Sequence, residues 1–545
     1  MKVYSEKSAP AASRYVRLAG CLLLIAAFAL SPTVAPLARA TSDQDKSKTS
    51  NADEKPKPAN EKLFREAKKK IRAGKYDDAL KTYRGMIDAD ATDVQARLGA
   101  SFAYFKMQQY LSCFEIAMDV IKTNPNNSRA HALAGIALLR SGFIRGSIGE
   151  LQRALDLDDK EALAYGAAAE IDYYEGRAKE SRQRSYFAHQ LDPEEPDYLI
   201  TYARASSRVE EFKEAADAYE LFLEVSPSTD TERRDRIRGL IQFYRQLAGL
   251  QVHQISGPSI TEVPFQLGND RRPYVKLKLN GRDATFVIDT GSGFTVISKD
   301  AAKKFGVDEI ARGGKSQGVG GSGKFHIVYG LIKNLQMGAA RVRMVPCFIR
   351  PFHVAADRSA EERADGFLGL SVLSHFLTEL DYKEARMRLD RTERTTPAEA
   401  PPGVTLVPFR TTQNGLISVE TEFDGSPHVN AILDSGASST VISTAAAKRL
   451  NLMDQIIPGQ TASVIGAAGI TDNVQVLFIR NCRVADQLQN NLRALVLNFD
   501  AINETSGFEQ SGILGGDFLR HFRLTIDFSR ALVALQPHSP PLNKQ

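Results

Sequence analysis

Two similar stretches of the chain each place an aspartate at a tight glycine turn. Phe286–Ser298 reads FVIDTGSGFTVIS and Ala431–Ser443 reads AILDSGASSTVIS, so that Asp289 and Asp434 lie 145 residues apart. Each follows an apolar run typical of a buried strand. Two carboxyl groups held side by side cannot both ionise cheaply, so they share a proton. Such a pair can activate a water molecule, and neither aspartate alone can be given the acid role.

The segments around the two aspartates are repeated at matched spacings. Each aspartate ends a predicted β-hairpin whose turn carries the Asn-Gly or Asp-Gly pair typical of tight turns. The repeated parts are the hairpins 273–289 and 416–434, the glycine-rich tips 318–324 and 464–470, the apolar-apolar-Gly segments 367–369 and 513–515, and the closing strands 377–390 and 523–537. One Asp-Thr-Gly would be a common turn sequence, but this set of matched parts indicates a tandem duplication.

The order of these parts, from about Val263 to Pro537, resembles that of the retropepsin-like aspartic proteases. The resemblance implies a pair of all-β acid-protease units that hydrolyse peptide bonds without a metal, a cofactor or a covalent intermediate. It implies that Asp289 and Asp434 are the catalytic dyad and that two glycine-rich flaps close over the substrate. The residues implied to orient the loops are Thr290, Gly291, Ser292, Ser435, Gly436 and Ala437, and those of the flaps are Gly318, Gly320, Gly321, Gly466 and Gly469.

The residues beside the aspartates have distinct expected roles. We expect Gly291 and Gly436 to let the backbone turn sharply and bring its N–H groups near the carboxylates. The resemblance implies that the hydroxyls of Thr290 and Ser435 hydrogen-bond across to the opposite loop. The unlike loops and flaps of the two units favour an internal pair of diverged halves. The alternative is that each unit pairs with its copy in another chain.

A period of 34 residues marks the chain between about residues 60 and 230. Pro125, Pro193 and Pro227 end predicted helices at separations of 68 and 34 residues, and Ala73–Ile87 carries small and aromatic residues at the matching phases. This pattern resembles tetratricopeptide (TPR) repeats. It predicts an all-α solenoid of about five helix pairs with a capping helix at 233–250. The resemblance implies a protein partner or peptide ligand, whereas the alternative is that the array only holds the other half in place.

The first forty residues have the pattern of a secretory signal peptide. Basic residues precede the apolar run Leu18–Leu30, and small residues before and at Ala40 offer a cleavage site. The apolar run is shorter than the roughly 20 residues of a membrane span, so we expect cleavage after Ala40 rather than a retained anchor. The mature chain would be secreted or periplasmic. Residues 41–59 are polar and are predicted to form a disordered tether.

Composition and charge exclude other classes of function. The net charge is +5, from 70 basic and 65 acidic residues spread along the chain, so we expect no nucleic-acid surface. Cys113, Cys347 and Cys482 have spacings that match neither a disulfide framework nor a metal site, and buried free thiols are expected.

Two further pairs of residues occupy matched positions in the two units. For His375 and His521 we expect packing or helix capping rather than metal binding. For Asp381 and Asp527, in the closing strands, we expect turn or salt-bridge roles.

Together these features predict a multidomain, exported aspartic endopeptidase whose TPR array recruits a substrate or partner. The rival prediction is a non-catalytic peptide-binding or assembly scaffold with an inert protease-like clamp. A third possibility is a zymogen restrained by the tether or the array. The predicted parts are a signal peptide at 1–40, a tether at 41–59, a TPR array at 60–252, retropepsin-like units at 260–390 and 404–538, and a proline-rich linker at 391–403.

Overall fold

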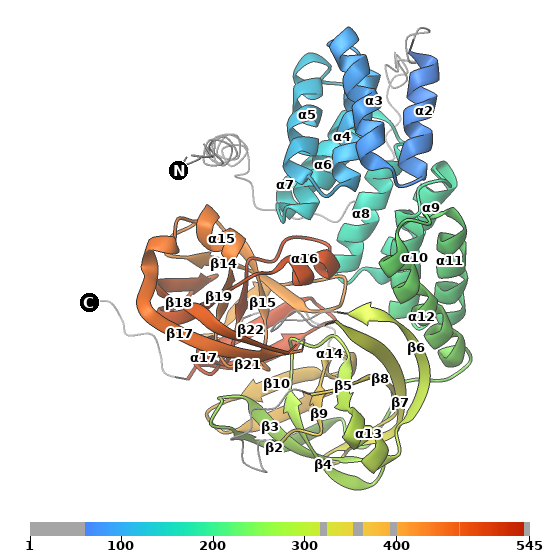
Figure 1. Cartoon of the computed structure of the whole chain (residues 1–545). Helices are drawn as coiled ribbons and strands as arrows, with labels where there is room; N and C mark the ends of the chain where they lie inside the picture. Colours follow the sequence, from blue (N-terminus) through green and yellow to red (C-terminus); the bar gives the residue numbers. More distant parts are fainter. Residues whose placement is uncertain (1–59, 317–323, 353–362, 393–399, 468, 539–545) are drawn as a thin grey trace, which may run out of the picture. The chain divides into compact units, whose positions relative to one another are not determined.

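The computed structural model describes residues 60–316, 324–352, 363–392, 400–467 and 469–538. An N-terminal helical region is followed by a β-rich C-terminal region (Figure 1). The predicted signal peptide, the tether, part of the linker and the tip of the first flap lie outside the described residues. In the part of the chain that the structure covers, no helix has the length and apolar character required to cross a membrane.

The helical region consists of antiparallel helix pairs. At the turn within each pair one residue has a left-handed backbone, which closes the preceding helix. The residues are Gly74, Gln108, Gly142, Gly176 and Glu210, with φ of 71°, 60°, 82°, 80° and 62°, spaced by the 34-residue period. The helices are α2 (Glu61–Arg72), α3 (Tyr76–Ala89), α4 (Val94–Lys106), α5 (Tyr110–Thr123), α6 (Ser128–Arg140), α7 (Ile144–Leu157), α8 (Ala162–Tyr174), α9 (Ala178–Leu191), α10 (Asp197–Arg208), α11 (Phe212–Val225) and α12 (Thr231–Leu247).

The β-rich region contains two units of similar sequence order. The first has β1 (Gln254–Ser256), β2 (Ile260–Leu267), β3 (Pro273–Leu279), β4 (Arg282–Ile288), β5 (Thr295–Ser298), α13 (Lys299–Phe305), β6 (Asp308–Ser316), β7 (Phe325–Met337), β8 (Ala340–Arg350), β9 (Gly366–Leu368), α14 (Leu370–Leu373), β10 (Leu377–Asp381) and β11 (Arg386–Asp390). The second has β12 (Thr405–Pro408), β13 (Arg410–Thr411), β14 (Ile417–Phe423), β15 (Val429–Leu433), β16 (Val441–Ser443), α15 (Thr444–Arg449), the 3₁₀ helix η2 (Met453–Gln455), β17 (Ile456–Gly466), β18 (Gly469–Val484), β19 (Gln487–Leu497), α16 (Asp500–Ser506), β20 (Gly512–Leu514), α17 (Gly516–Leu519), β21 (Phe522–Asp527) and β22 (Leu532–Pro537).

The two units have the same strand order. In unit 1 the order is β3-β4-β9-β5-β8-β7-β6, and in unit 2 it is β14-β15-β20-β16-β19-β18-β17. Each aspartate-bearing strand pairs in parallel with the apolar-apolar-Gly strand of its own unit, β4 with β9 and β15 with β20. The tandem duplication that the sequence predicts is therefore visible in the sheet topology.

A further sheet joins the two units within one chain. Its order is β12-β22-β21-β10-β11-β2, with one strand of each unit, β10 and β21, paired antiparallel at its centre. The prediction of a single closing strand in each unit is wrong, because each closing segment is a hairpin of two strands. The turns fall at residues 382–385 and 528–531, where Ala385 and Ala531 have left-handed backbones.

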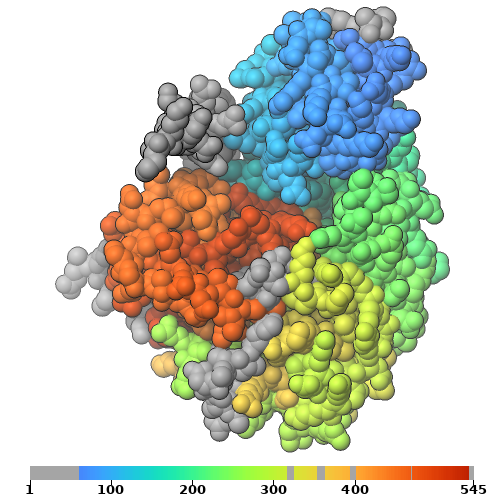
Figure 2. Space-filling view, viewed as in Figure 1, coloured from blue at the N-terminus to red at the C-terminus, as the bar shows by residue number. Residues whose placement is uncertain are grey.

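The last helices of the helical region share an apolar core with unit 1. Phe243 of α12 stacks on Tyr329 of β7 with ring centroids 4.3 Å apart, and Leu331 lies in the same cluster. Gly239 of α12 faces Gly313 of β6 so closely that a Cβ on Gly239 would lie 2.5 Å from the Gly313 Cα. In the space-filling view the green helices and the yellow-green strands form one continuous surface (Figure 2).

Candidate active site

Asp289 and Asp434 each come directly after the strand that delivers them, β4 or β15. The N–H of Asp289 donates to the carbonyl of Leu368 and that of Asp434 to the carbonyl of Leu514, both at 3.0 Å. The apolar strands are buried because a second strand covers each edge, while both carboxyl-bearing residues remain partly exposed. The parallel pairing thus fixes the position of each aspartate at the end of its strand.

Reciprocal hydrogen bonds connect the two aspartate loops. The hydroxyl of Thr290 donates to the carbonyl of Leu433 at 2.8 Å and accepts the N–H of Ser435 at 2.9 Å. The hydroxyl of Ser435 donates to the carbonyl of Ile288 at 2.7 Å and accepts the N–H of Thr290 at 3.0 Å. Both hydroxyl side chains are fully buried. The single chain therefore holds its two loops together with four bonds that follow one pseudo-twofold pattern.

The glycines of the two loops have a second role beside the one expected. Neither Gly291 nor Gly436 has a left-handed backbone. A Cβ on Gly291 would lie 2.2 Å from Cγ of Asp434, and one on Gly436 would lie 2.4 Å from Oδ1 of Asp289. Glycine is required there because each loop passes directly against the opposite carboxyl group. The N–H groups do lie near the carboxylates, as expected: that of Gly291 donates to Asp289 Oδ1 at 3.0 Å.

The two carboxyl groups influence each other's ionisation. Burial raises the pKa of Asp289 well above its usual range, and the charge of Asp434 and a hydrogen bond between the two side chains act in the same direction. Burial also raises the pKa of Asp434, opposed by that bond and by N–H donors from Gly436 and Ala437. A pair of this kind retains one shared proton at a pH where an isolated carboxyl is ionised.

The helices behind the loops fix the residues that follow each aspartate. The N–H of Leu370 in α14 donates to the carbonyl of Ser292 at 2.8 Å, and that of Gly516 in α17 donates to the carbonyl of Ala437 at 2.7 Å. The Ser292 hydroxyl donates to the carbonyl of Phe294 within the same loop. These bonds connect the residues after each aspartate to the helix behind its loop.

The predicted flap residues are only partly described. Gly318, Gly320 and Gly321 lie outside the described residues. Gly466 and Gly469 are paired at the end of the β17–β18 hairpin, and Gly469 has a φ of 133°, which favours glycine. This hairpin occupies the position in unit 2 that β6–β7 occupies in unit 1.

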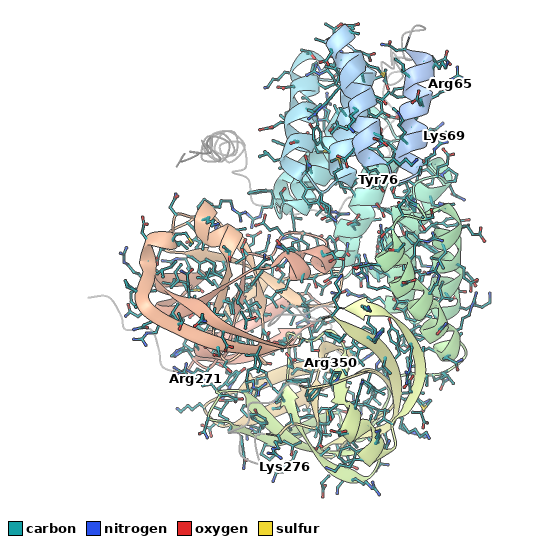
Figure 3. The ribbon with its side chains drawn as sticks, in the orientation of Figure 1. Arg65, Lys69, Tyr76, Arg271, Lys276 and Arg350 are labelled. Carbon is teal, nitrogen blue, oxygen red and sulfur yellow. The ribbon has the colours of Figure 1, made fainter. Side chains whose placement is uncertain are left out.

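Sequence reasoning missed one charged side chain near the dyad. Arg350 ends β8 opposite Ser298 of β5, and its positive charge opposes the burial that raises the pKa of Asp289. Its guanidinium lies 5.2 Å from the ring centroid of Phe352 and 5.6 Å from that of Phe367. Arg350 is labelled in Figure 3. The equivalent position in unit 2 is Leu497, so the duplication gave no signal for it.

A cavity of about 1470 Å³ lies beside the Asp289 loop. Its wall includes Ser292 and Phe294 of unit 1, Asn414 of unit 2, and side chains from the helical region such as Arg204 and Tyr173. Helical array and protease-like units thus enclose one space, which no local sequence pattern could indicate.

The remaining residues singled out from the sequence are structural in the described chain or lie elsewhere. Asp381 accepts the N–H groups of Lys383 and Glu384 and pairs with Arg523 at 2.7 Å. Asp527 likewise accepts the N–H of Ser529 at 3.0 Å. Both therefore hold turns, as expected.

The cysteines and the matched histidines take no part in the four hydrogen bonds between the aspartate loops. All three described cysteines, Cys113, Cys347 and Cys482, are buried free thiols, as expected. The ring of His375 lies against that of His253, with centroids 4.4 Å apart.

Family models match three parts of the chain. The model described as an aspartyl protease matches residues 275–372, and the putative aspartyl protease of the gag polyprotein matches residues 419–521. A tetratricopeptide-repeat model matches residues 70–135. No curated protein sequence matches the chain. The predicted order, TPR repeats followed by two aspartyl protease domains, is confirmed.

Solved structures are similar to each of these parts. A thermophilic TPR protein of Thermus thermophilus is 15% identical, covering 35% of this chain and 100% of its own, with a TM-score of 0.28. The aspartic proteinase of Irpex lacteus is 13% identical, covering 52% of this chain and 99% of its own, with a TM-score of 0.34.

Proposed function

We propose that this chain, in which TPR repeats precede two aspartyl protease domains, is an aspartic endopeptidase with a single active site made by both domains. The observation that carries the proposal is the pair Asp289 and Asp434. The two carboxyl groups are hydrogen-bonded to each other, and both pKa values are raised. A carboxylate with a structural role is normally paired with a cation or with N–H donors. Two adjacent carboxyl groups cost free energy, and a role in acid–base catalysis accounts for such an arrangement.

The proposed reaction needs only a water molecule and the shared proton. The ionised carboxylate takes a proton from a water held between the two groups, and the protonated carboxyl donates a hydrogen bond to the scissile carbonyl. The water oxygen attacks the carbonyl carbon while the protonated carboxyl passes its proton to the carbonyl oxygen, which forms a gem-diol. The C–N bond then breaks as the carboxyl that took the water proton gives it to the leaving nitrogen. The other carboxylate takes a proton from a gem-diol hydroxyl, and the pair returns to its one-proton state.

The reciprocal loop bonds support this reaction by positioning. The hydroxyls of Thr290 and Ser435 fix the distance between the carboxyls, and the absence of a Cβ on Gly291 and Gly436 lets them approach. Pre-set geometry of this kind lowers the barrier because no reorganisation is needed during the reaction. Closure of the β17–β18 hairpin would exclude bulk water.

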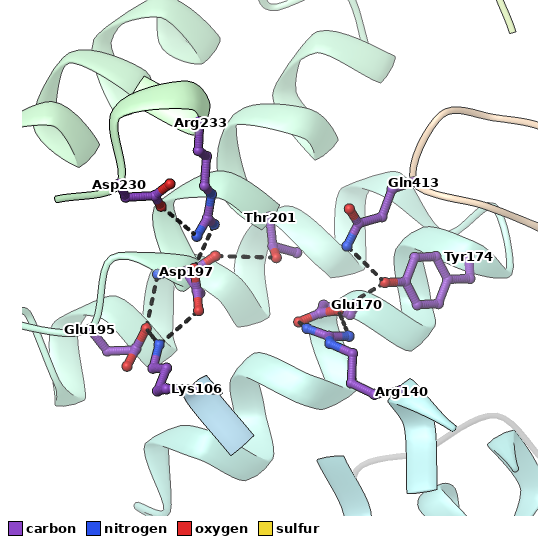
Figure 4. A network of polar contacts seen from close by, with 10 residues as sticks. All are labelled: Lys106, Arg140, Glu170, Tyr174, Glu195, Asp197, Thr201, Asp230, Arg233 and Gln413. Atoms are coloured by element: carbon purple, nitrogen blue, oxygen red, sulfur yellow. Dashed lines mark hydrogen bonds and ion pairs between the residues drawn. The ribbon is translucent and has the colours of Figure 1, made fainter. Parts of the chain in front are cut away.

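We also propose that the helical array recruits a protein substrate through the cavity that it shares with the protease domains. Paired charges line this cavity: Lys106 with Asp197, and Arg140 with Glu170 (Figure 4). Ser292 and Phe294, just past the dyad, form part of the same wall. A long substrate could therefore contact both the array and the dyad. A protein substrate should show a higher kcat/KM than a short peptide containing the same bond.

Export of the mature chain is part of the proposal and rests on the signal-like pattern of residues 1–40. Cell fractionation with antibody detection tests the cellular location. The N-terminal sequence of the recovered protein tests the cleavage after Ala40.

The deciding experiment compares the purified chain with Asp289→Asn and Asp434→Asn in a library of peptides from denatured proteins, between pH 3 and 8, read by mass spectrometry. Each variant should lose activity by about 100- to 10,000-fold, the usual contribution of an acid–base group. Asp283→Asn is the matched control, because Asp283 is an exposed aspartate of the same hairpin whose side chain pairs with Lys278.

Comparing the two variants distinguishes internal from intermolecular pairing. An internal dyad predicts that both variants are inactive, whereas pairing of each unit with its copy in another chain predicts that only one of them loses activity. Undiminished cleavage by either variant would rule out the dyad. If the unaltered chain cleaves nothing but binds peptides, the inert clamp is the correct function.

A further inference from the structure

Three side chains from separate parts of the chain meet beside the cavity. Glu210 occupies the turn after α10, His253 lies in the segment between α12 and β1, and His375 follows α14 of unit 1. One potential metal-ligand atom from each lies within 4.8 Å of the other two. Within the described ranges, no other set of three histidine, cysteine or carboxylate side chains comes so close.

One buried nitrogen of this cluster lacks a hydrogen-bond partner among the described residues. His253 Nδ1 and Glu210 Oε1 are 3.2 Å apart. His253 Nε2 is buried and, among the described residues, has no hydrogen-bond partner. A buried imidazole nitrogen normally has a partner, because leaving one without costs free energy. The ring centroids of His253 and His375 are 4.4 Å apart, and the two rings are tilted by 37°.

The backbone holds the cluster in place. Glu210 stands at the turn position where glycine occurs in three of the other repeats, with a φ of 62°. His253 also has a left-handed backbone, with a φ of 49°, and its N–H donates to the carbonyl of Met344 at 3.2 Å. Such conformations are unfavourable for these residues and persist where the surroundings impose them. The structure therefore maintains an unfavourable backbone at two of the three positions.

We propose that Glu210, His253 and His375 bind one divalent transition-metal cation of the zinc class, which ties the end of the helical array to protease unit 1. Two imidazoles and one carboxylate form a donor set that zinc accepts, with ligand distances of about 2.0–2.2 Å. Glu210 and His375 are exposed and can shift by the small amount needed, whereas His253 is held. All three line the cavity, so a remaining coordination position is open to water.

This site is distinct from the dyad but physically connected to it. His375 follows α14 directly, and α14 donates the N–H groups of Leu370 and Ser371 to the carbonyls of Ser292 and Gly293, both at 2.8 Å. A cation on His375 would fix the element that supports the Asp289 loop. Cation binding does not require the dyad to be active, so Asp289→Asn should bind zinc like the unaltered chain.

The test is zinc binding by the whole chain, prepared without a histidine tag and freed of metal with a chelator. Isothermal titration with zinc should show one site per chain. His253→Ala, His375→Ala and Glu210→Gln should each weaken binding by at least about tenfold, because a ligand is lost. His521→Ala is the matched control: His521 is the counterpart of His375 in unit 2 and should leave binding unchanged.

Stability and chemical footprinting give two further readouts. Saturating zinc should raise the Tm of the unaltered chain and of His521→Ala but not of His375→Ala. If a variant fails to fold, the unaltered chain still decides the question: zinc should protect His375 from diethyl pyrocarbonate, with His521 as the internal reference. Absence of zinc binding, or binding of equal affinity in the three ligand variants, would overturn the proposal.

Discussion

Asp434 is better placed than Asp289 to carry the negative charge of the pair. It accepts the N–H groups of Gly436 and Ala437 at 2.8 and 3.0 Å, whereas Asp289 accepts only that of Gly291 in its own loop. Each such donor stabilises the anion. The shared proton should therefore reside mainly on Asp289, although the titration belongs to the pair.

Replacing Asp289 with Asn should stabilise the folded chain at neutral pH. Burial and Asp434 raise the pKa of Asp289, so the folded chain binds this proton more tightly than the unfolded chain. The folded chain therefore loses stability as the pH rises from about 4, the ordinary pKa of a carboxyl group, to the raised pKa of Asp289. Asn does not ionise, so its advantage should grow over that interval to the order of 1 kcal/mol. Thermal unfolding of the unaltered chain and of Asp289→Asn from pH 4 to 8 measures the difference in their stability. A difference that does not change with pH would contradict the raised pKa of Asp289.

Ser435→Ala should reduce both stability and activity. The change leaves the buried N–H of Thr290 and the buried carbonyl of Ile288 without their partner. Each such group costs about 1–3 kcal/mol, so we expect a loss of about 2–4 kcal/mol in the free energy of unfolding. Urea titration measures it. Ser438→Ala, in the same loop, is the control for stability and should change it by less than about 0.5 kcal/mol.

From the sequence alone, the duplicated motif predicts Asp289 and Asp434 as a pair, because each stands at the same position of its copy. It could not give the reason for Gly291 and Gly436, which depends on the distance to the opposite loop. Arg350 was missed because its counterpart is Leu497, so the duplication hides it. The group formed by Glu210, His253 and His375 was invisible because long separations in sequence intervene.

At the scale of elements, α12 braces the β6–β7 hairpin of unit 1. Gly239 and Gly313 bring the two backbones into contact, and Lys324, at the end of the undescribed tip, pairs with Glu232 at 2.7 Å. Among the described residues, the hairpin of unit 2, β17–β18, makes no contact of that extent with α12. The two proposed flaps are therefore unequal, and we expect that of unit 2 to open more readily.

Gly239→Ala should loosen this brace. A Cβ at 2.5 Å from the Gly313 Cα cannot be accommodated without a backbone shift, and overpacking of this kind costs about 1–3 kcal/mol. Hydrogen exchange in β6 and β7 should accelerate, and the Tm should fall. Gly149→Ala in α7 is the control: nothing lies within 4 Å of its added Cβ, so it should stabilise the helix by about 0.5–1 kcal/mol. Unchanged exchange in β6 and β7 would show that α12 does not brace the hairpin.

The order of elements was predictable where a periodicity or a turn signal existed. The hairpin turns at Asn280-Gly281 and Asp424-Gly425 fall where the sequence places them. The sequence predicts a single strand for each closing hairpin, because the turns contain no glycine or proline. Ala385 and Ala531 adopt left-handed backbones there, held by pairing on both sides, which a local pattern does not reveal.

At the scale of the molecule, the helical array is part of the protease-like fold rather than an appendage. Arg140 of α6 donates to the carbonyl of Gly507 in unit 2 at 3.0 Å and pairs with Glu170, while Phe243 shares an apolar cluster with Tyr329 and Leu331 of unit 1. The first of these contacts joins residues 367 positions apart. The 34-residue period predicts the helices but contains no information about the surface on which they pack.

Removal of the array should therefore destabilise the protease units rather than release them. A fragment from Gln251 onward loses α12, which covers Tyr329, Phe348 and Leu331 in a shared apolar cluster. At about 25 cal/mol for each Å² of apolar surface exposed, uncovering side chains of this size costs several kcal/mol. We expect the fragment to have a lower Tm, to bind a hydrophobic dye, and to cleave peptides more slowly than the whole chain. A zymogen restrained by the array predicts the opposite, so a stable fragment with faster cleavage would show that the array inhibits the dyad.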